Sequence, residues 1–391
     1  MSPAVRVHVV DPSAFTPPYD HALCRALAAA GAEVELYTSH FDYGPVAPAE
    51  GYERHEFFYR VSPGAGHARL RLAAKLIQHV PDMLRYRARA RAADVVHFQW
   101  VALQHVDRHL LPARAAGASR RRPLVLTAHD ILPREPRRGQ REAQRRLYDR
   151  FDAIVVHSEH GRARLTGELG LDPARVHVIP HGVLLGAQEL PGEDAGGESW
   201  LPAELRGGDR PVVLFFGLLR PYKGIDVLLE AWRERDLGRS GAAELWIVGM
   251  PRMDISSLRS AAPAGVRFVP RFVSGREIPA VMSRASLVVL PYREIDQSGV
   301  ALTALGLGVP LLLSDVGGFP EIAATGAART VPPGDPAALG EALEQLLGDP
   351  GELAAMASSA RAAAEGEYAW AGIARKTLEL YELLLGENPC R

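Results

Sequence analysis

Two loops in the second half of the chain combine glycine, positive charge and backbone amides in a pattern that suits a diphosphate. The apolar run Val212–Phe216 stops at Gly217, and Arg220 and Lys223 follow closely. Fixed cations and the N-terminus of a helix both stabilise phosphate oxygens. A second loop supplies small residues that leave backbone N–H groups free just ahead of a helical segment: Gln297, Ser298, Gly299 and Val300. The two loops predict a site for a nucleoside diphosphate.

The elements that must carry these loops form two series in which strands and helices alternate. Helical patterns at 22–30, 67–91 and 141–150 separate strands of the first series. The expected strands are apolar throughout, which is typical of parallel sheets covered on both faces. The sequence therefore predicts an α/β protein with two Rossmann-like, doubly wound parallel-sheet domains facing a central cleft. The strand-like runs are 5–10, 34–38, 95–98, 124–128, 153–157 and 176–179, then 212–216, 245–248, 266–269, 287–290, 310–313 and 329–331.

The same pattern sets the expected domain boundaries. The first domain should span 1–185 and the second 211–368. Between them, 186–210 is rich in glycine, proline and acids, so we interpret it as a linker. A last helix within 369–391 is expected to leave the second domain and pack back on the first.

Composition narrows the class of protein. Of 391 residues, 47% are hydrophobic and 23% charged, with a net charge of −1, so no overall field attracts nucleic acid. Two cysteines, Cys24 and Cys390, cannot build a disulfide framework and favour a reducing compartment. The N-terminus lacks the apolar core of a signal peptide, and no run is long enough to span a membrane. We therefore expect a cytoplasmic protein.

Five segments, taken in their order and spacing, connect the chain to a known family. They are TAHD (127–130), VHVIPHGV (176–183), FFGLLRPYKGIDVLLEAW (215–232), ASLVVLPY (285–292) and ALGLGVPLLLSDVGGFPE (304–321). Over nearly its full length the chain resembles the family 4 retaining glycosyltransferases of GT-B fold. The resemblance implies an enzyme that moves a sugar from a nucleoside-diphosphate sugar to a hydroxyl acceptor, with retention at the anomeric carbon.

The resemblance also gives roles to the two cations. Arg220 and Lys223 match the family's paired cations, which stabilise the charge that builds on the departing diphosphate. An isolated Arg-x-x-Lys would more often be a solvated loop, but its place after Gly217 favours the functional interpretation. No metal or other cofactor is expected, because the chain shows no Asp-x-Asp and no Cys/His cluster with ligand spacing. Contacts to the nucleotide base are expected near Arg271, largely from backbone, so UDP, GDP and ADP stay open as donors.

The chain departs from the family where most members carry two glutamates eight positions apart. Alignment on GVP (308–310) places those positions at Ile295 and Thr303. Glu294 or Asp296 could replace the first glutamate, which contacts donor-sugar hydroxyls, while Thr303 offers only a hydroxyl near the ribose. The departure is compatible with a variant subfamily, an altered nucleotide preference or lost activity. We favour the variant subfamily.

In the first domain, the resemblance directs attention to two loops. His129 and Asp130 follow an apolar strand, and we expect His129 to contact the donor sugar rather than to abstract a proton. The loop after the first strand has the sequence DPSAFTPPYDHA. Prolines in it should stiffen the loop, so that Tyr19 and Asp20 project polar groups towards the acceptor. Alternatively, Asp20 begins a helix as its N-cap.

A basic segment at 134–150 contains seven arginines. Such a segment can dock on anionic lipid at the inner membrane face when it forms an amphipathic helix. Three acids interrupt it, so a solvated helix face is favoured. Nucleic-acid binding lacks any recognised module. Besides an active transferase, two alternatives stay open: another GT-B enzyme such as a nucleotide-sugar epimerase, and a non-catalytic relative that binds nucleotide. The sequence leaves the oligomeric state open.

Overall fold

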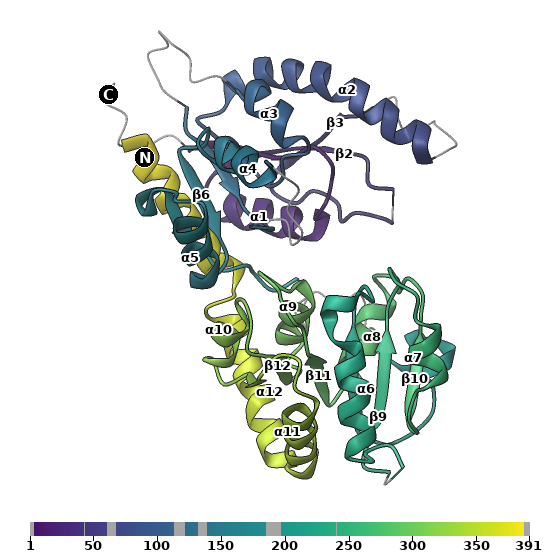
Figure 1. Cartoon of the computed structure of the whole chain (residues 1–391). Coiled ribbons are helices and arrows are strands. Elements are labelled where there is room, and N and C mark those ends of the chain that lie inside the picture. The colour runs from purple at the N-terminus through teal and green to yellow at the C-terminus, as the bar shows by residue number, and fades with distance from the viewer. Residues whose placement is uncertain are drawn as a thin grey trace. The chain divides into compact units, whose positions relative to one another are not determined.

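The computed structural model describes residues 4–42, 44–60, 68–112, 122–131, 139–184, 197–239 and 241–386, with 68–73 as backbone only (Figure 1). The chain divides into two compact units. Unit 1 consists of Met1–Gly182 together with Trp370–Arg391, and unit 2 of Val183–Ala369. Each unit is built around one parallel sheet.

Seven parallel strands form the sheet of unit 1, in the order β3-β2-β1-β4-β5-β6-β7. The order reverses between β1 and β4, the point at which ligands bind in open α/β sheets. The three strands Val95–Phe98, Leu124–Thr127 and Ala153–Val156 are buried along their whole length, as expected for strands covered on both faces. The strands are β1 (Arg6–Asp11), β2 (Glu33–Ser39), β3 (Glu53–Phe58), β4 (Val95–Phe98), β5 (Leu124–Thr127), β6 (Ala153–Val156) and β7 (Val176–Val178).

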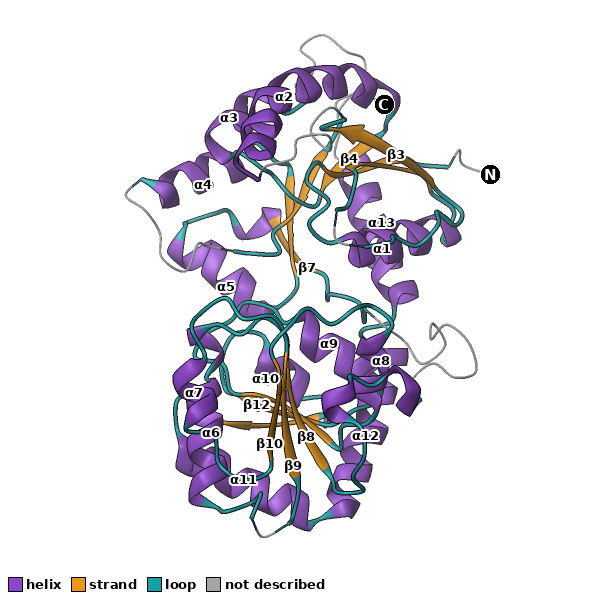
Figure 2. Cartoon of the chain, turned by 90° about the vertical axis from the view of Figure 1, so that its right-hand side faces the viewer, coloured by secondary structure: helices purple, strands orange, loops and turns teal. Residues whose placement is uncertain are grey.

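Helices cover both faces of this sheet (Figures 1 and 2). Helix α13, the last in the chain, packs along α1, while α3 contacts both α2 and α4. The Tyr381 hydroxyl of α13 lies 2.6 Å from Nδ1 of His97 in β4, which ties the C-terminal helix to the centre of the sheet. The helices are α1 (Pro17–Ala29), α2 (Ala68–Arg89), α3 (Gln104–Leu110), α4 (Gln140–Tyr148), α5 (Glu159–Glu168) and α13 (Trp370–Gly386).

Unit 2 contains a six-stranded parallel sheet in the order β10-β9-β8-β11-β12-β13, which reverses between β8 and β11. Its strands are β8 (Val212–Phe216), β9 (Glu244–Val248), β10 (Val266–Val269), β11 (Leu287–Leu290), β12 (Leu311–Ser314) and β13 (Ala328–Val331). Its helices are α6 (Ile225–Glu234), α7 (Ser256–Ser260), α8 (Glu277–Ser283), α9 (Gly299–Gly306), α10 (Phe319–Ala323), α11 (Pro336–Gly348) and α12 (Pro350–Glu365).

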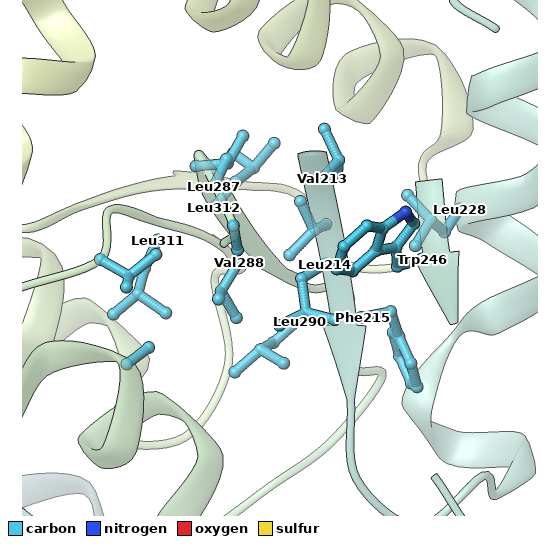
Figure 3. Packing of buried hydrophobic residues seen from close by; sticks show 14 of the residues in the cluster. Val213, Leu214, Phe215, Leu228, Trp246, Leu287, Val288, Leu290, Leu311 and Leu312 are labelled. Carbon is cyan, nitrogen blue, oxygen red and sulfur yellow. The ribbon is translucent and has the colours of Figure 1, made fainter. Parts of the chain in front are cut away.

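The core of unit 2 forms around β8, β11 and β12, whose residues are almost all apolar and buried. Figure 3 shows their side chains packed together with those of neighbouring elements. This packing fixes the ends of the strands, and with them the loops that follow. The labelled residues are Val213, Leu214, Phe215, Leu228, Trp246, Leu287, Val288, Leu290, Leu311 and Leu312.

The predicted α/β architecture is confirmed, and every predicted strand is present with its ends displaced by one residue at most. Sequence analysis missed β3, because its sequence ERHEFF is mostly charged and lies at the edge of the sheet, where one side needs no partner. The proposed linker is described from residue 197 onwards, where it forms short 3-10 turns at Glu198–Trp200 and Ala203–Leu205, and Leu201 and Leu205 are buried in the core of unit 2. Of the basic segment 134–150, residues 134–138 lie outside the described chain, and in α4 Arg146 pairs with Glu142 at 2.8 Å.

Candidate active site

In unit 2 the candidate residues lie at the carboxyl ends of β8 and β11, beside the reversal of strand order. Gly217 is the first residue after β8 and has φ of +114°, in the region that glycine tolerates best. A Cβ atom placed there would lie 3.0 Å from Lys223 Nζ and 3.2 Å from Val300 Cγ2. Gly217 therefore marks a point at which the ammonium group and the first turn of α9 come together.

Lys223 is held in place by Tyr292. The lysine is 7% exposed, its Nζ donates to the Tyr292 hydroxyl at 3.0 Å, and it lies 4.8 Å from the centre of the same ring. Gly224, the next residue, has φ of +68°, and a Cβ there would overlap the carbonyl oxygen of Pro291. Backbone and side-chain contacts thus fix Lys223 against the loop after β11. Tyr292 was missed as a site residue, because an aromatic after an apolar strand usually belongs to the core.

The N-terminus of α9 offers backbone donors beside this ammonium group. Ser298 is the N-cap, and its Oγ accepts a hydrogen bond from the N–H of Ala301 at 3.3 Å. Within the described part of the chain, no hydrogen bond occupies the N–H groups of Gly299 and Val300. These amides, together with the positive end of the helix dipole, are suited to bind an anion. Gln297, just before the cap, is partly buried.

Arg220 differs from Lys223 in its exposure. It lies directly before the short 3-10 helix Pro221–Lys223, its side chain is exposed, and no carboxylate of the described residues pairs with it. An unpaired guanidinium on a loop is available for a phosphate, which it can bind through two parallel N–H donors.

The structure shows the surroundings of the positions that align with the family's two glutamates. Ile295 packs against the core of unit 2, and its exposed neighbour Glu294 makes no hydrogen bond or ion pair with any described residue. Asp296 is partly buried. Thr303 is buried inside α9, where its hydroxyl donates to the carbonyl of Gly299 at 2.8 Å. The Thr303 proton is thus engaged within the helix, which leaves only its lone pairs for a ligand.

Arg271 follows β10 and is occupied by a neighbour. Its guanidinium forms two hydrogen bonds with Glu277, at 2.7 and 3.3 Å. Glu277 also accepts the N–H and the hydroxyl proton of Ser274, and the hydrogen bond from Arg271 is the main reason that its pKa falls to about 2. The arginine therefore orders the loop after β10, and its charge is already neutralised.

In unit 1, one polar residue stands just beyond each of four adjacent strands. Gln99 follows β4, His129 follows β5, His157 follows β6 and His181 follows β7. Parallel strands end at the same edge of a sheet, so these residues meet. Ring centroids of His129 and His157 are 5.1 Å apart, and those of His157 and His181 are 5.0 Å apart.

The hydrogen bonds of this cluster have a defined direction. His157 Nδ1 lies 3.0 Å from the carbonyl oxygen of Ile179, which only accepts, so this nitrogen carries the proton. His157 Nε2 must then accept from His129 Nδ1, 3.2 Å away. His129 Nε2 is left as an acceptor. The atom of Gln99 placed 3.2 Å from it is Oε1, which cannot donate, so we assign the carboxamide in the reversed orientation, with its NH2 group towards His129. Both nitrogens of His129 are engaged.

Burial keeps the cluster uncharged. Removal from water lowers the pKa of His157 to about 4 and that of His181 to about 3, and it lowers the pKa of His129 well below its usual range. The neighbouring imidazoles add repulsion for His129 and His181. At neutral pH these rings are therefore neutral, as the hydrogen-bond directions require.

The prediction that Tyr19 and Asp20 project from a loop towards the acceptor needs correction, because both residues belong to α1 and face the interior of unit 1. Both are buried, and Tyr19 packs edge-on against the His129 ring at a centroid distance of 4.7 Å. Burial and the neighbouring Asp11 hold the pKa of Asp20 well above its usual range, and the two carboxyl groups share a hydrogen bond. The N-cap of α1 is Thr16, so Asp20 is not the cap.

The error has a physical reason. Pro17 and Pro18 do not stiffen a loop. They form the first turn of α1, where proline is favoured because its missing N–H is not needed. The helix thus starts early and turns Tyr19 and Asp20 inward. The loop itself is folded by Asp11, whose carboxylate accepts the N–H groups of Ser13 and Phe15 at 3.2 and 2.6 Å.

A pocket of about 250 Å³ lies beside His129 at the ends of β4 and β5. Exposed Asp130 lines it, as do Trp100, Gln99 and Gln144. Gln144 donates its NH2 group to the Tyr148 hydroxyl at 2.7 Å, which leaves its buried Oε1 without a partner among the described residues. With its NH2 end turned to His129, Gln99 likewise keeps a buried carbonyl oxygen without a partner. The lining therefore offers hydrogen-bond acceptors.

One group of metal-ligand type occurs among the described residues. Glu35, Glu53 and His55 come together where β2 pairs with β3. His55 Nε2 and the Tyr37 hydroxyl both bond to one Glu35 oxygen, at 2.9 and 2.7 Å, so the group satisfies itself. Spacing along the chain did not reveal it, because the pairing of two strands creates it.

Comparison with known proteins agrees with this architecture. Residues 19–185 match the model described as Glycosyltransferase Family 4, and residues 210–349 match the one described as Glycosyl transferases group 1. A D-inositol 3-phosphate glycosyltransferase from Nocardia farcinica is 30% identical, over 92% of this chain and 83% of that protein. A GDP-mannose-dependent alpha-(1-6)-phosphatidylinositol monomannoside mannosyltransferase from Mycolicibacterium smegmatis is also 30% identical, over 71% of this chain and 73% of the relative.

Solved structures share the fold over nearly the whole chain. Sucrose-phosphate synthase from Thermosynechococcus elongatus superimposes with a TM-score of 0.73 at 20% identity, covering 98% of this chain and 99% of that one. Anabaena Alr3699/HepE, solved with UDP-glucose, gives a TM-score of 0.69 at 18% identity, with 97% and 99% covered.

The family models, the relatives and the fold together identify a glycosyltransferase of GT-B type. The chain belongs to Glycosyltransferase Family 4, as its sequence predicted. None of the helices in the described ranges is long and apolar enough to cross a membrane.

Proposed function

We propose that this enzyme transfers a sugar from a nucleoside-diphosphate sugar to a hydroxyl of its acceptor, with retention at the anomeric carbon and without a metal ion. The observation that carries the proposal is the convergence at Gly217 of the Lys223 ammonium group and the first turn of α9, whose amides are free. Positive charge and oriented N–H donors are what a departing diphosphate requires.

In the proposed reaction, the bond between the anomeric carbon and the diphosphate oxygen breaks, and the electron pair leaves with the diphosphate. Arg220, Lys223 and the amides of Gly299 and Val300 stabilise the charge. The acceptor oxygen forms the new bond on the same face, and its proton passes to the departing diphosphate. We assign His129 a contact with the donor sugar and not the role of the base. Burial lowers its pKa, its Nδ1–H donates to His157, and its Nε2 faces Gln99.

We assign the pocket beside His129 to the acceptor. Its described lining offers the carboxamide oxygen of Gln144, the carboxylate of Asp130 and the indole ring of Trp100. In the orientation assigned above, the carboxamide oxygen of Gln99 adds a further acceptor. Hydroxyl groups donate to such oxygens, and an indole face suits the apolar face of a sugar or cyclitol ring. The relative from Nocardia farcinica, whose name states an inositol phosphate, is compatible with an acceptor of this polyhydroxylated class.

The experiment that tests the function offers the purified chain a panel of UDP-, GDP- and ADP-sugars with polyhydroxylated acceptors, in the presence of EDTA. We expect release of free nucleoside diphosphate and a product whose anomeric proton keeps the donor's configuration by NMR. A product of inverted configuration would reject retention, and release only on addition of a divalent metal would reject metal independence. Epimerised donor would favour an epimerase, and absence of turnover a binding protein.

A matched pair of variants tests the replacement of the missing glutamate. We propose that Glu294 or Asp296 binds donor-sugar hydroxyls, because these acids flank Ile295. Removing the correct acid leaves sugar hydroxyls unpaired, so alanine there should reduce discrimination between donor sugars by about tenfold or more while hardly changing affinity for the free diphosphate. The other variant serves as control. If Glu294→Ala and Asp296→Ala both keep wild-type donor preference, backbone amides alone hold the sugar.

A further inference from the structure

Three side chains that can bind a metal meet at the edge of the unit 1 sheet: Glu35 of β2, and Glu53 and His55 of β3. In the parallel register Glu35 lies opposite Glu53, and His55 is two residues further along β3. Residues at a spacing of two project from the same face of a strand, so the three side chains share one face of the sheet. Each offers one ligand atom, and these atoms all lie within 4.8 Å of one another.

The separations between these atoms match those around a small metal ion. His55 Nε2 lies 2.9 Å from Glu35 Oε2 and 3.6 Å from Glu53 Oε2. In a tetrahedral zinc site, bonds of about 2.1 Å place neighbouring ligand atoms about 3.4 Å apart. The side chains of Glu35 and His55 are 28% and 34% exposed, and that of Glu53 is 77% exposed. An ion can therefore reach the three atoms from solvent and keep water as a further ligand.

The carboxylate of Glu35 is held in position before any ion binds. The Tyr37 hydroxyl donates to its Oε2 at 2.7 Å. Behind the other oxygen lies His8, which is 1% exposed and has Nε2 3.6 Å from Glu35 Oε1, beyond normal hydrogen-bond range. The Tyr86 hydroxyl lies 3.4 Å from the second ring nitrogen of His8 and helps to orient that ring. Buried polar groups that aim a ligand from behind are a usual feature of metal sites.

We propose that Glu35, Glu53 and His55 bind a transition-metal ion of the zinc class, with water completing the coordination. Imidazole and carboxylate together favour such an ion over Mg²⁺ and Ca²⁺, which prefer oxygen ligands alone. The ion takes the place of the proton between His55 Nε2 and Glu35 Oε2, and the neutral imidazole keeps its remaining proton on Nδ1. The transfer reaction is proposed to proceed in EDTA, so the two proposals stand or fall separately.

The ion ties the edge strand to the rest of the sheet. Strand β3 is the last in the strand order and pairs with β2. Of its six side chains only that of Phe58 is buried, so burial contributes little to holding the strand. Two ligands come from β3 and one from β2, which makes the ion a link between the strands. Because the strand pairing builds the site, binding of the ion should stabilise the native state.

The test is calorimetric titration of the full chain with ZnCl2, after treatment with EDTA and dialysis. We expect one Zn²⁺ per chain at this site and no comparable binding of MgCl2. His55→Ala should weaken Zn²⁺ binding about 100-fold, and Glu53→Gln, at a largely exposed side chain, about tenfold or more. Zn²⁺ should also raise the midpoint of chemical denaturation of the wild type and leave that of His55→Ala unchanged.

His40→Ala is the matched control. His40 Nδ1 lies 3.4 Å from Glu56 Oε2 at the same edge of the sheet, but no third ligand of the described residues joins this pair. The variant should bind Zn²⁺ like the wild type, and circular dichroism should show that all variants are folded. The proposal is overturned if the wild type does not bind Zn²⁺, or if His55→Ala and Glu53→Gln bind it as tightly as the wild type does. Equal affinity for Mg²⁺ and Zn²⁺ would likewise overturn it, because the imidazole would then not be a ligand.

Discussion

Replacement of Lys223 by alanine is expected to lower turnover by about 10²–10³-fold, the scale on which enzymes lose activity when one charge-stabilising donor is removed. The ammonium group lies beside Gly217 and the first turn of α9, where the departing diphosphate is proposed to bind. Arg220→Ala should have an effect of similar size, because its exposed guanidinium has no protein partner among the described residues. Steady-state release of nucleoside diphosphate measures both.

Two further variants make this result specific. Arg239→Ala removes a cation of unit 2 whose side chain is 81% exposed, and it should leave turnover unchanged. Tyr292→Phe removes the hydroxyl that accepts from Lys223 but keeps the ring, so its loss should be smaller than that of Lys223→Ala. Near wild-type turnover in both Lys223→Ala and Arg220→Ala would remove the two cations from the mechanism.

Acid is expected to destabilise unit 1 strongly, and the loss should begin at mildly acidic pH. A histidine in the unfolded chain titrates near pH 6.5. In the native state, burial lowers the pKa of His157 and His8 to about 4, and that of His97 and His181 to about 3. At pH values between the native and the unfolded pKa, these histidines bind protons in the unfolded chain but stay neutral in the native state. Stability is thus complete above about pH 6.5 and falls as the pH drops towards 4.

Each of these imidazoles contributes about 1.4 kcal/mol per pH unit across that window. Asp11 and Asp20 titrate in the opposite sense, because their raised pKa values let the native state bind protons first, and they offset part of the loss. Chemical denaturation at a series of pH values gives the slope. His157→Gln should make the slope shallower by about one proton. A stability that stays flat from pH 7 to 4.5 would contradict the assignment.

Sequence patterns predicted most of the fold because buried strands appear in the sequence as continuous apolar runs. A run such as 212–216 is apolar on both faces, and that pattern belongs to a covered parallel strand. The edge strand β3 has no such apolar run. Its sequence is ERHEFF, and the strand is held by pairing with β2 and not by burial. Helix starts were less certain, as the prolines at the start of α1 show.

The candidate site was partly predictable for a similar reason. Gly217 and Lys223 are close in sequence, so their spacing reports their proximity. The hydrogen-bonded series of Gln99, His129 and His157 is brought together only by the order of β4, β5 and β6. A single sequence shows these residues as separate loop positions. Tyr292 was overlooked because its contact with Lys223 depends on the adjacency of β8 and β11.

The most direct test of the central claim is the affinity of the chain for nucleotides that differ by one phosphate. Calorimetric titration in EDTA should show that one nucleoside diphosphate among UDP, GDP and ADP binds about tenfold to a hundredfold more tightly than its monophosphate. That is the range expected from charged hydrogen bonds to the second phosphate. In Lys223→Met most of this preference should disappear. Equal affinity for the diphosphate and the monophosphate, or an unchanged preference in Lys223→Met, would contradict a diphosphate site at Gly217 and α9.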